Sequence, residues 1–137
     1  TGMSTIGETD KLVNWLEKYG KGDYILLHTN SSYPAPHKEL NLKVIITLRE
    51  RYNCLVGYSG HEDDLEPSVY AAVLGARVIE RHITLSHDMW GSDQKASLEI
   101  QAMNLLRGRI LGIKEMMGDG NKVLLESELK KRSELKK

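Results

Sequence analysis

The chain lacks the features that mark secreted, membrane-spanning or nucleic-acid-binding proteins. Cys54 is its only cysteine, so no disulfide framework is possible, and we expect a reducing, cytoplasmic setting. Its 19 basic and 19 acidic residues cancel to a net charge of 0, which gives no electrostatic basis for binding nucleic acid or an anionic membrane. No apolar run approaches the roughly 20 residues that a transmembrane helix needs. What is present, 137 residues of which 40% are apolar, is enough for one domain with a buried core.

Helical and strand-like segments alternate along the chain. Hydrophobic periodicity predicts helices over residues 6–19, 40–52, 67–74 and 97–117, and strands over residues 24–28, 55–58 and 77–84. Thr9 or Asp10 could cap the first helix, and residues 1–5 have the pattern of a strand end that leads into a loop. This alternation with short loops predicts an α/β fold, in which parallel strands are joined by right-handed crossovers.

The number of predicted strands is half of what a closed barrel requires. One strand end and three full strands are present, whereas a (β/α)₈ barrel needs about 250 residues. The chain opens without an initiator Met and part-way through an element. We therefore expect a fragment of a larger protein, with half of a (β/α)₈ barrel over residues 1–120 and a highly charged linker or tail over residues 121–137.

Two histidines occupy equivalent places after successive predicted strands. His61 and His82 each follow a short apolar run, with one compact helical stretch between them. This order would bring both imidazoles to the same edge of a parallel sheet, where α/β folds keep their chemistry. Two neutral imidazoles there suit a borderline divalent metal, although structural histidines remain the alternative. His28 lies inside an apolar run, so we predict a hydrogen-bonded core histidine there.

Four polar clusters follow the predicted strands or lead into the last helix. The clusters are His28-Thr29-Asn30-Ser31-Ser32-Tyr33-Pro34-Ala35-Pro36, Gly57-Tyr58-Ser59-Gly60-His61-Glu62, Glu80-Arg81-His82-Ile83-Thr84-Leu85 and Trp90-Gly91-Ser92-Asp93-Gln94-Lys95-Ala96-Ser97-Leu98-Glu99. Together with the opening residues and the run at 71–76, they closely resemble the sialic acid synthase family, enzymes that condense phosphoenolpyruvate with an N-acyl sugar aldehyde. The resemblance covers residues 1 to about 133, and any one motif is weak without the others.

The resemblance implies an architecture for the complete protein. It implies a (β/α)₈ TIM barrel followed by a small antifreeze-like domain, working as a homodimer. This chain would then be the C-terminal half of the barrel, from the end of strand five through helix eight, followed by a linker toward the antifreeze-like domain. It would carry only part of the active site. The implied substrates are phosphoenolpyruvate and an N-acyl sugar such as N-acetylmannosamine, with release of phosphate.

The resemblance also implies catalytic and metal-binding roles. His61 and His82 match the two metal ligands of the family, which hold Mn²⁺ or a similar divalent ion such as Mg²⁺ or Co²⁺. A bound cation of this kind would polarise the aldehyde oxygen as a Lewis acid. Glu80 would lie beside the metal, where it could orient the sugar or take a proton. A structural ion pair between Glu80 and Arg81 is the alternative.

Four further positions match substrate contacts of the family. Ser59 matches a serine at the phosphate of phosphoenolpyruvate, and Ser31 falls where the family has Asn or Ser at the same phosphate. Asn30 would serve instead if the loop is shifted by one residue. Tyr33 and Asp93 match residues that line the sugar side of the pocket, with turn chemistry and an anchor for the last helix as their respective alternatives.

Two other classes of function remain open on the sequence. A half-barrel would expose two sheet edges, so a non-catalytic binding or assembly module is one alternative. A related metal-dependent aldolase or lyase with a different substrate is the other. Trp90 is expected to pack at the barrel mouth, with stacking on the substrate as the alternative.

Overall fold

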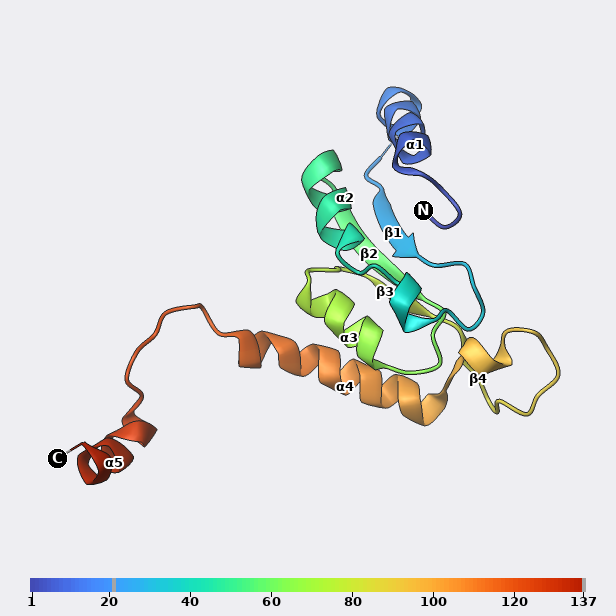
Figure 1. Ribbon diagram of the computed structural model, residues 1–137. Helices are drawn as coiled ribbons and strands as arrows, with labels where there is room; N and C mark the ends of the chain where they lie inside the picture. Colours follow the sequence, from blue (N-terminus) through green and yellow to red (C-terminus); the bar gives the residue numbers. More distant parts are fainter. Residues whose placement is uncertain (21, 137) are drawn as a thin grey trace.

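Helices and parallel strands alternate in the computed structural model, which describes residues 1–20 and 22–136 (Figure 1). Lys137, the last residue of the predicted tail, lies outside the described residues. The helices are α1 (Ile6–Tyr19), α2 (Val44–Tyr52), α3 (Glu66–Val73), α4 (Ile100–Met117) and α5 (Glu126–Leu135), with short 3₁₀ helices η1 (His37–Glu39) and η2 (Gln94–Ala96). The strands are β1 (Ile25–Thr29), β2 (Leu55–Gly60), β3 (Ile79–Arg81), β4 (Ile83–Thr84) and β5 (Leu98–Glu99).

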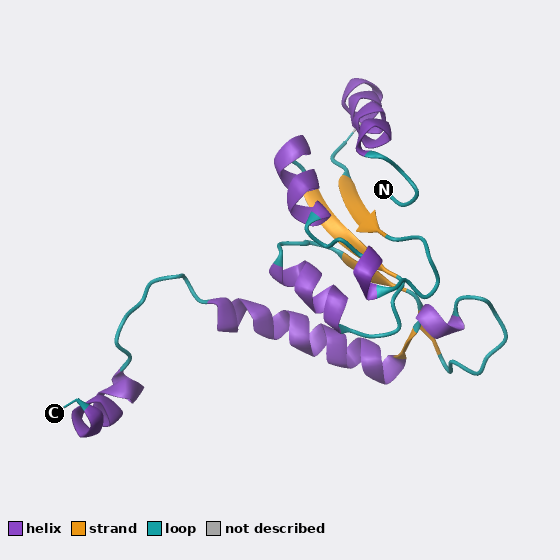
Figure 2. Ribbon diagram, in the orientation of Figure 1, coloured by secondary structure: helices purple, strands orange, loops and turns teal. Residues whose placement is uncertain are grey.

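The main sheet has the order β1-β2-β3, and both pairings are parallel. Figure 2 shows these strands side by side, with α2 and α3 along one side of them. The register pairs Leu27 with Gly57 and Ser59 with Glu80, so the carboxyl ends of the strands meet at one edge. The predicted α/β fold with parallel strands is therefore confirmed.

The core lies between β2 and the two helices that cover it. Ile45 and Leu48 of α2 are three positions apart, so they share the helix face that points at the sheet. They pack with Val56, Tyr58 and Ala71, and all five side chains are at most 1% exposed. Burial of each large apolar side chain contributes about 1.5–3 kcal/mol. This packing fixes β2, the strand that leads directly to His61.

The last predicted strand is wrong in one respect, because it is divided between two sheets. β3 pairs with β2, whereas β4 pairs in parallel with β5. The backbone N–H of Leu98 donates to the carbonyl of His82 at 2.8 Å, so the chain changes partner at His82. For the same reason α4 begins at Ile100 and not at residue 97, because residues 98–99 are held in strand pairing.

The capping residue of α1 and the N-terminal boundary of α2 also differ from the prediction. Thr5 caps α1, in place of Thr9 or Asp10: its hydroxyl accepts from the Glu8 N–H at 3.3 Å, and its own N–H donates to the Glu8 carboxylate at 2.7 Å. α2 begins at Val44 and not at residue 40, because Asn41 adopts a left-handed conformation with φ of 43°.

The charged C-terminal segment is separate from the sheet. α4 ends at Gly118, which has a φ of 59°, and α5 is exposed along its length and lies apart from the other elements (Figure 1). A domain boundary after residue 120 stays a prediction. None of the helices within the described part of the chain is both long and apolar enough to span a membrane.

Candidate active site

Three aromatic rings converge beyond the carboxyl ends of β1, β2 and β3. The rings of His61 and His82 have centroids 5.3 Å apart, with an angle of 75° between their planes. The Tyr33 ring, from the loop after β1, stacks on His61 at 4.2 Å and lies edge-on to His82 at 5.5 Å. The two histidines that the sequence predicts to converge are therefore side by side, on the same side of the sheet.

Two hydrogen bonds define the tautomer of His61. Its Nδ1 lies 2.7 Å from the backbone carbonyl oxygen of Asn30, which can only accept a hydrogen bond, so Nδ1 carries the proton. Its Nε2 then presents a lone pair and accepts from the Tyr33 hydroxyl at 3.1 Å. The residue is buried, at 7% exposure. An imidazole oriented through one nitrogen with the other free of a proton is typical of a metal ligand.

A carboxylate approaches the second histidine. Oδ2 of Asp93 lies 3.8 Å from Nδ1 of His82, and both side chains are part-exposed. Asp93 stands directly before η2, and its own carbonyl accepts from the Ser97 hydroxyl at 2.8 Å. Asp93 therefore lies near His82, and its contact with the sugar stays a prediction. It does not anchor α4 directly, because the N-cap of that helix is Glu99.

Ser59 and Glu80 form a polar pair on the paired strands β2 and β3. The Ser59 hydroxyl donates to Oε1 of Glu80 at 2.7 Å, and Ser59 is buried whereas Glu80 is exposed. The alternative of an ion pair between Glu80 and Arg81 is wrong, because Arg81 pairs with Glu62 at 3.1 Å. Glu80 is therefore free to face the site from the strand that carries His82.

Ser31 lies apart from the two histidines. It lines a cavity of about 830 Å³ between α1 and the end of β1, together with Thr5, His28 and Asn30, and neither His61 nor His82 belongs to this lining. Asn30 links the two regions, because its carbonyl accepts from His61 while the residue also lines the cavity. The structure thus brings Tyr33, Asp93 and the histidines together and leaves Ser31 beside them.

Two residues outside the site bear on other sequence predictions. His28 is the hydrogen-bonded core histidine that its apolar surroundings predict: its Nε2 lies 2.7 Å from the Leu40 carbonyl oxygen, and burial lowers its pKa. Trp90 is 97% exposed, so the expectation that it packs is wrong for this chain.

Sequence reasoning missed the buried charges of Glu62 and Arg81, although each stands next to a predicted metal ligand. The alternation of side chains along a strand was the available signal. If His61 and His82 face the site, their neighbours must face the core, where a charge needs a partner.

Within the described residues, no group of three or more His, Cys, Asp or Glu side chains forms a complete metal site.

Comparison with known proteins identifies the family. A profile of the NeuB family matches residues 1–122. The chain belongs to the NeuB family. It is 43% identical to an N,N'-diacetyllegionaminic acid synthase of Campylobacter jejuni over 132 residues, which are 95% of this chain and 40% of that protein. It is also 43% identical to an N-acetylneuraminate-9-phosphate synthase of Drosophila melanogaster over 115 residues, which are 83% of this chain and 31% of that protein.

The NeuB-family assignment extends to solved structures. The fold matches a crystal structure of the N-acetylneuraminic acid (sialic acid) synthetase of Leptospira borgpetersenii with a TM-score of 0.83 and 31% identity, over 99% of this chain and 48% of that one. The chain therefore spans less than half the length of these relatives. The resemblance to sialic acid synthases is confirmed, and so is the part-barrel α/β architecture that it implies.

Proposed function

We propose that the complete protein is a nonulosonic acid synthase, which condenses phosphoenolpyruvate with an N-acyl sugar aldehyde and releases phosphate. The observation that carries this proposal is the convergence of His61, His82 and Tyr33 at the carboxyl edge of the sheet. Such edges hold the active sites of α/β barrels. Relatives named as legionaminic acid, pseudaminic acid and N-acetylneuraminate-9-phosphate synthases support the reaction class.

A divalent metal ion is proposed as the cofactor. Mn²⁺ is the preferred candidate, and Mg²⁺ and Co²⁺ are the alternatives. The residues present fit such an ion, because Nε2 of His61 has a lone pair and the His82 ring is 5.3 Å from the His61 ring. Two imidazole ligands leave coordination positions for water and substrate, as a catalytic site requires. The ion would supply Lewis-acid polarisation of the aldehyde carbonyl.

The chain's own side chains would bind and orient the substrates around that centre. Ser59 and Ser31 are proposed to donate to the phosphate, and the Ser59 hydroxyl would turn from Glu80 toward the anion when it binds. Tyr33, Glu80 and Asp93 are proposed to face the sugar. Glu80 is an exposed carboxylate next to Ser59, and it forms no ion pair with the residues that the structure describes, so it can accept from a sugar hydroxyl or take a proton.

The proposal also covers the sugar substrate, the oligomeric state and the cellular location of the complete protein. N-acetylmannosamine is the first sugar to test, since the relatives are named for several different nonulosonic acids. A homodimer is proposed for the complete protein, and light scattering measures it directly. The single cysteine, Cys54, supports a cytoplasmic location.

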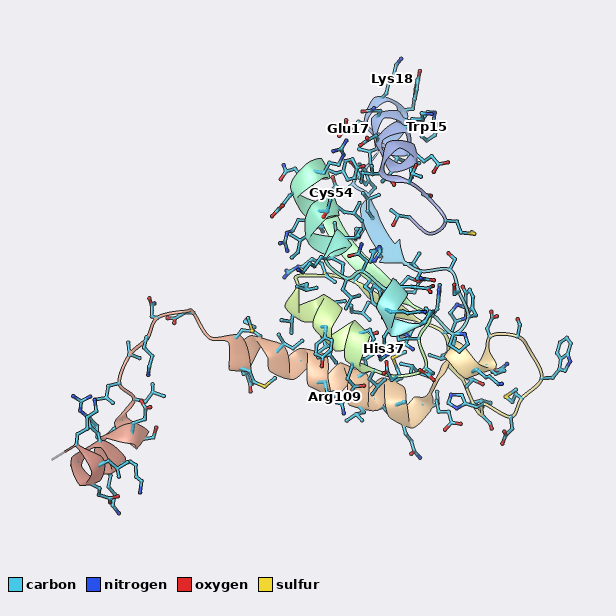
Figure 3. The ribbon with its side chains drawn as sticks, viewed as in Figure 1. Trp15, Glu17, Lys18, His37, Cys54 and Arg109 are labelled. Carbon is cyan, nitrogen blue, oxygen red and sulfur yellow. The ribbon has the colours of Figure 1, made fainter. Side chains whose placement is uncertain are left out.

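The test is phosphate release by the complete protein with phosphoenolpyruvate, N-acetylmannosamine and Mn²⁺. Loss of several kcal/mol of carbonyl polarisation lowers a rate by at least about 100-fold, so His61→Ala and His82→Ala should lose turnover by that factor. His37→Ala is the matched control, because His37 lies on η1 (Figure 3), its side chain is 60% exposed and it pairs with Asp64.

Three results would contradict the proposal or redirect it. Activity that survives removal of metal by EDTA would exclude the metal role. Full activity of His61→Ala would exclude the ligand assignment. No phosphate release with N-acetylmannosamine or any related N-acyl sugar aldehyde would favour a metal-dependent aldolase with another substrate.

A further inference from the structure

A second polar cluster lies next to the two histidines, formed by the residue after His61 and the residue before His82. Glu62 follows the end of β2 at Gly60, and its carboxylate accepts from the Tyr58 hydroxyl of β2 and the Ser68 hydroxyl of α3. Arg81 is the last residue of β3 and directly precedes His82. Glu62 and Arg81 meet there beneath α3, and both side chains are completely buried.

The contacts of this pair connect the segments that carry the histidines. Nη1 of Arg81 lies 3.1 Å from Oε1 of Glu62 and donates to the backbone carbonyl of Asp64 at 2.7 Å. Nη2 of Arg81 donates to the backbone carbonyl of Glu62 itself. One guanidinium on β3 therefore holds both the side chain and the backbone of the segment that follows His61.

Two further donors reach the Glu62 carboxylate. Its carboxylate accepts from the Tyr58 hydroxyl at 2.9 Å and from the Ser68 hydroxyl at 3.3 Å, which adds β2 and α3 to the cluster. Burial and the nearby Glu62 charge raise the pKa of Tyr58, so the hydroxyl stays protonated and remains a donor. The cluster is thus a hydrogen-bonded unit across three elements.

Gly60 provides the space that the Glu62 carboxylate occupies. A Cβ atom at Gly60 would lie 2.6 Å and 2.8 Å from the two carboxylate oxygens and 2.9 Å from the Tyr58 ring. These separations are shorter than any real contact, so a larger residue would displace the carboxylate. The glycine immediately before His61 is therefore matched to the charged residue immediately after it.

Stability alone does not account for such a pair. Removing two charges from water is costly, and apolar residues of similar volume often replace a buried ion pair without loss of stability. We propose that Glu62 and Arg81 are positioning residues, which hold His61 and His82 at the separation that a shared divalent ion needs. This inference rests on the metal role in the proposed function, and it assigns these residues no contact with substrate.

The test compares three variants of the complete protein. Arg81→Met leaves the buried Glu62 carboxylate without its cation, and the double variant Glu62→Leu/Arg81→Met removes both charges and restores an apolar interior. Arg109→Met is the control, since Arg109 forms an exposed ion pair with Glu66 at 2.6 Å between α4 and α3 (Figure 3). The readouts are Mn²⁺ affinity by calorimetry, the melting midpoint, and the His61 tautomer in the metal-free protein by nitrogen NMR.

Loss of outer-shell partners typically lowers metal affinity by about 10- to 100-fold. We expect that loss in Arg81→Met and in the double variant, even where the double variant melts like the wild type, together with a mixed His61 tautomer. Arg109→Met should match the wild type within about twofold, as exposed ion pairs contribute little. If Arg81→Met does not fold, the double variant carries the test.

The results separate failure of this inference from failure of the proposed function. A double variant with wild-type stability, wild-type Mn²⁺ affinity and an unchanged tautomer would overturn the positioning role. A wild-type protein that binds no Mn²⁺ would overturn the metal role instead. In that case a mixed tautomer in the variants would still support the positioning of His61, and an unchanged tautomer would refute it.

Discussion

The hydroxyl of Tyr33 occupies the nitrogen of His61 that a metal ion would need. Nδ1 of His61 is committed to the Asn30 carbonyl at 2.7 Å, so Nε2 has the only available lone pair, and it accepts from Tyr33 at 3.1 Å. One lone pair cannot serve a hydroxyl proton and a metal ion together. Metal binding at His61 must therefore break the hydrogen bond from Tyr33.

Tyr33→Phe removes this competition while it keeps the ring that stacks on His61 at 4.2 Å. A net hydrogen bond contributes about 0.5–1.5 kcal/mol, and each 1.4 kcal/mol is tenfold in affinity, so Mn²⁺ should bind about two- to twelvefold more tightly. Isothermal titration calorimetry of the metal-free complete protein measures this change. The direction is informative, because removal of a polar group beside a metal site would ordinarily be expected to weaken binding.

Tyr70→Phe is the matched control for this experiment. Tyr70 lies on α3, is 58% exposed and has no part in the site, so its Mn²⁺ affinity should equal that of the wild type. Weaker binding of Mn²⁺ by Tyr33→Phe would refute the argument, because it would mean that the hydroxyl supports the metal-bound form. An unchanged affinity in both variants would show that Nε2 of His61 is not a ligand.

Three further predictions concern stability. In Gly57→Ala the new Cβ would lie 2.6 Å from the backbone oxygen of Val78, so β2 must move; we expect a loss of about 1–3 kcal/mol. Gly108→Ala in α4 meets no atom within 4 Å and should instead gain about 0.5–1 kcal/mol. A melting midpoint that rises in Gly57→Ala would contradict the first prediction, and one that falls in Gly108→Ala would contradict the second. Burial lowers the pKa of His28, so the folded state favours the neutral ring. The contribution of this ring to the free energy of unfolding is therefore complete above the ordinary histidine pKa of about 6.5 and declines as the pH falls below it. His28→Gln, which can still donate to the Leu40 carbonyl, should flatten this decline between pH 7 and 5.5, and an identical pH profile of the melting midpoint would contradict the assignment.

Elements with a strong hydrophobic period were predictable, and elements held by pairing were not. The period of residues 6–19 predicts α1 with its observed bounds, because that period and the capping residues at each end are all local to the segment. β4 and β5 have two residues each and exist only because they pair with one another. No local pattern marks such short strands, so the division of the strand at His82 required the tertiary structure.

The candidate site likewise contains features that the sequence predicts and features that depend on the tertiary structure. Motif order and strand-end placement were sufficient to predict that His61 and His82 meet, since parallel strands bring their carboxyl ends to one edge. The sequence did not reveal that Tyr33 donates to His61 or that Ser31 lies in a neighbouring cavity, because both depend on the path of the loop after β1.

By itself, the amino-acid sequence determined the fold class, the family and the identity of the paired histidines, because these depend on periodicity, motif order and residue type. Only the tertiary structure decided which neighbours hold those histidines. Glu62 and Arg81 stand 19 positions apart, and their contact arises from two strands that α3 separates along the chain. The contact is required because both charges are buried, and a charge that has lost its water needs a partner of opposite charge. Burial arises only when the chain folds, so the sequence alone does not reveal it.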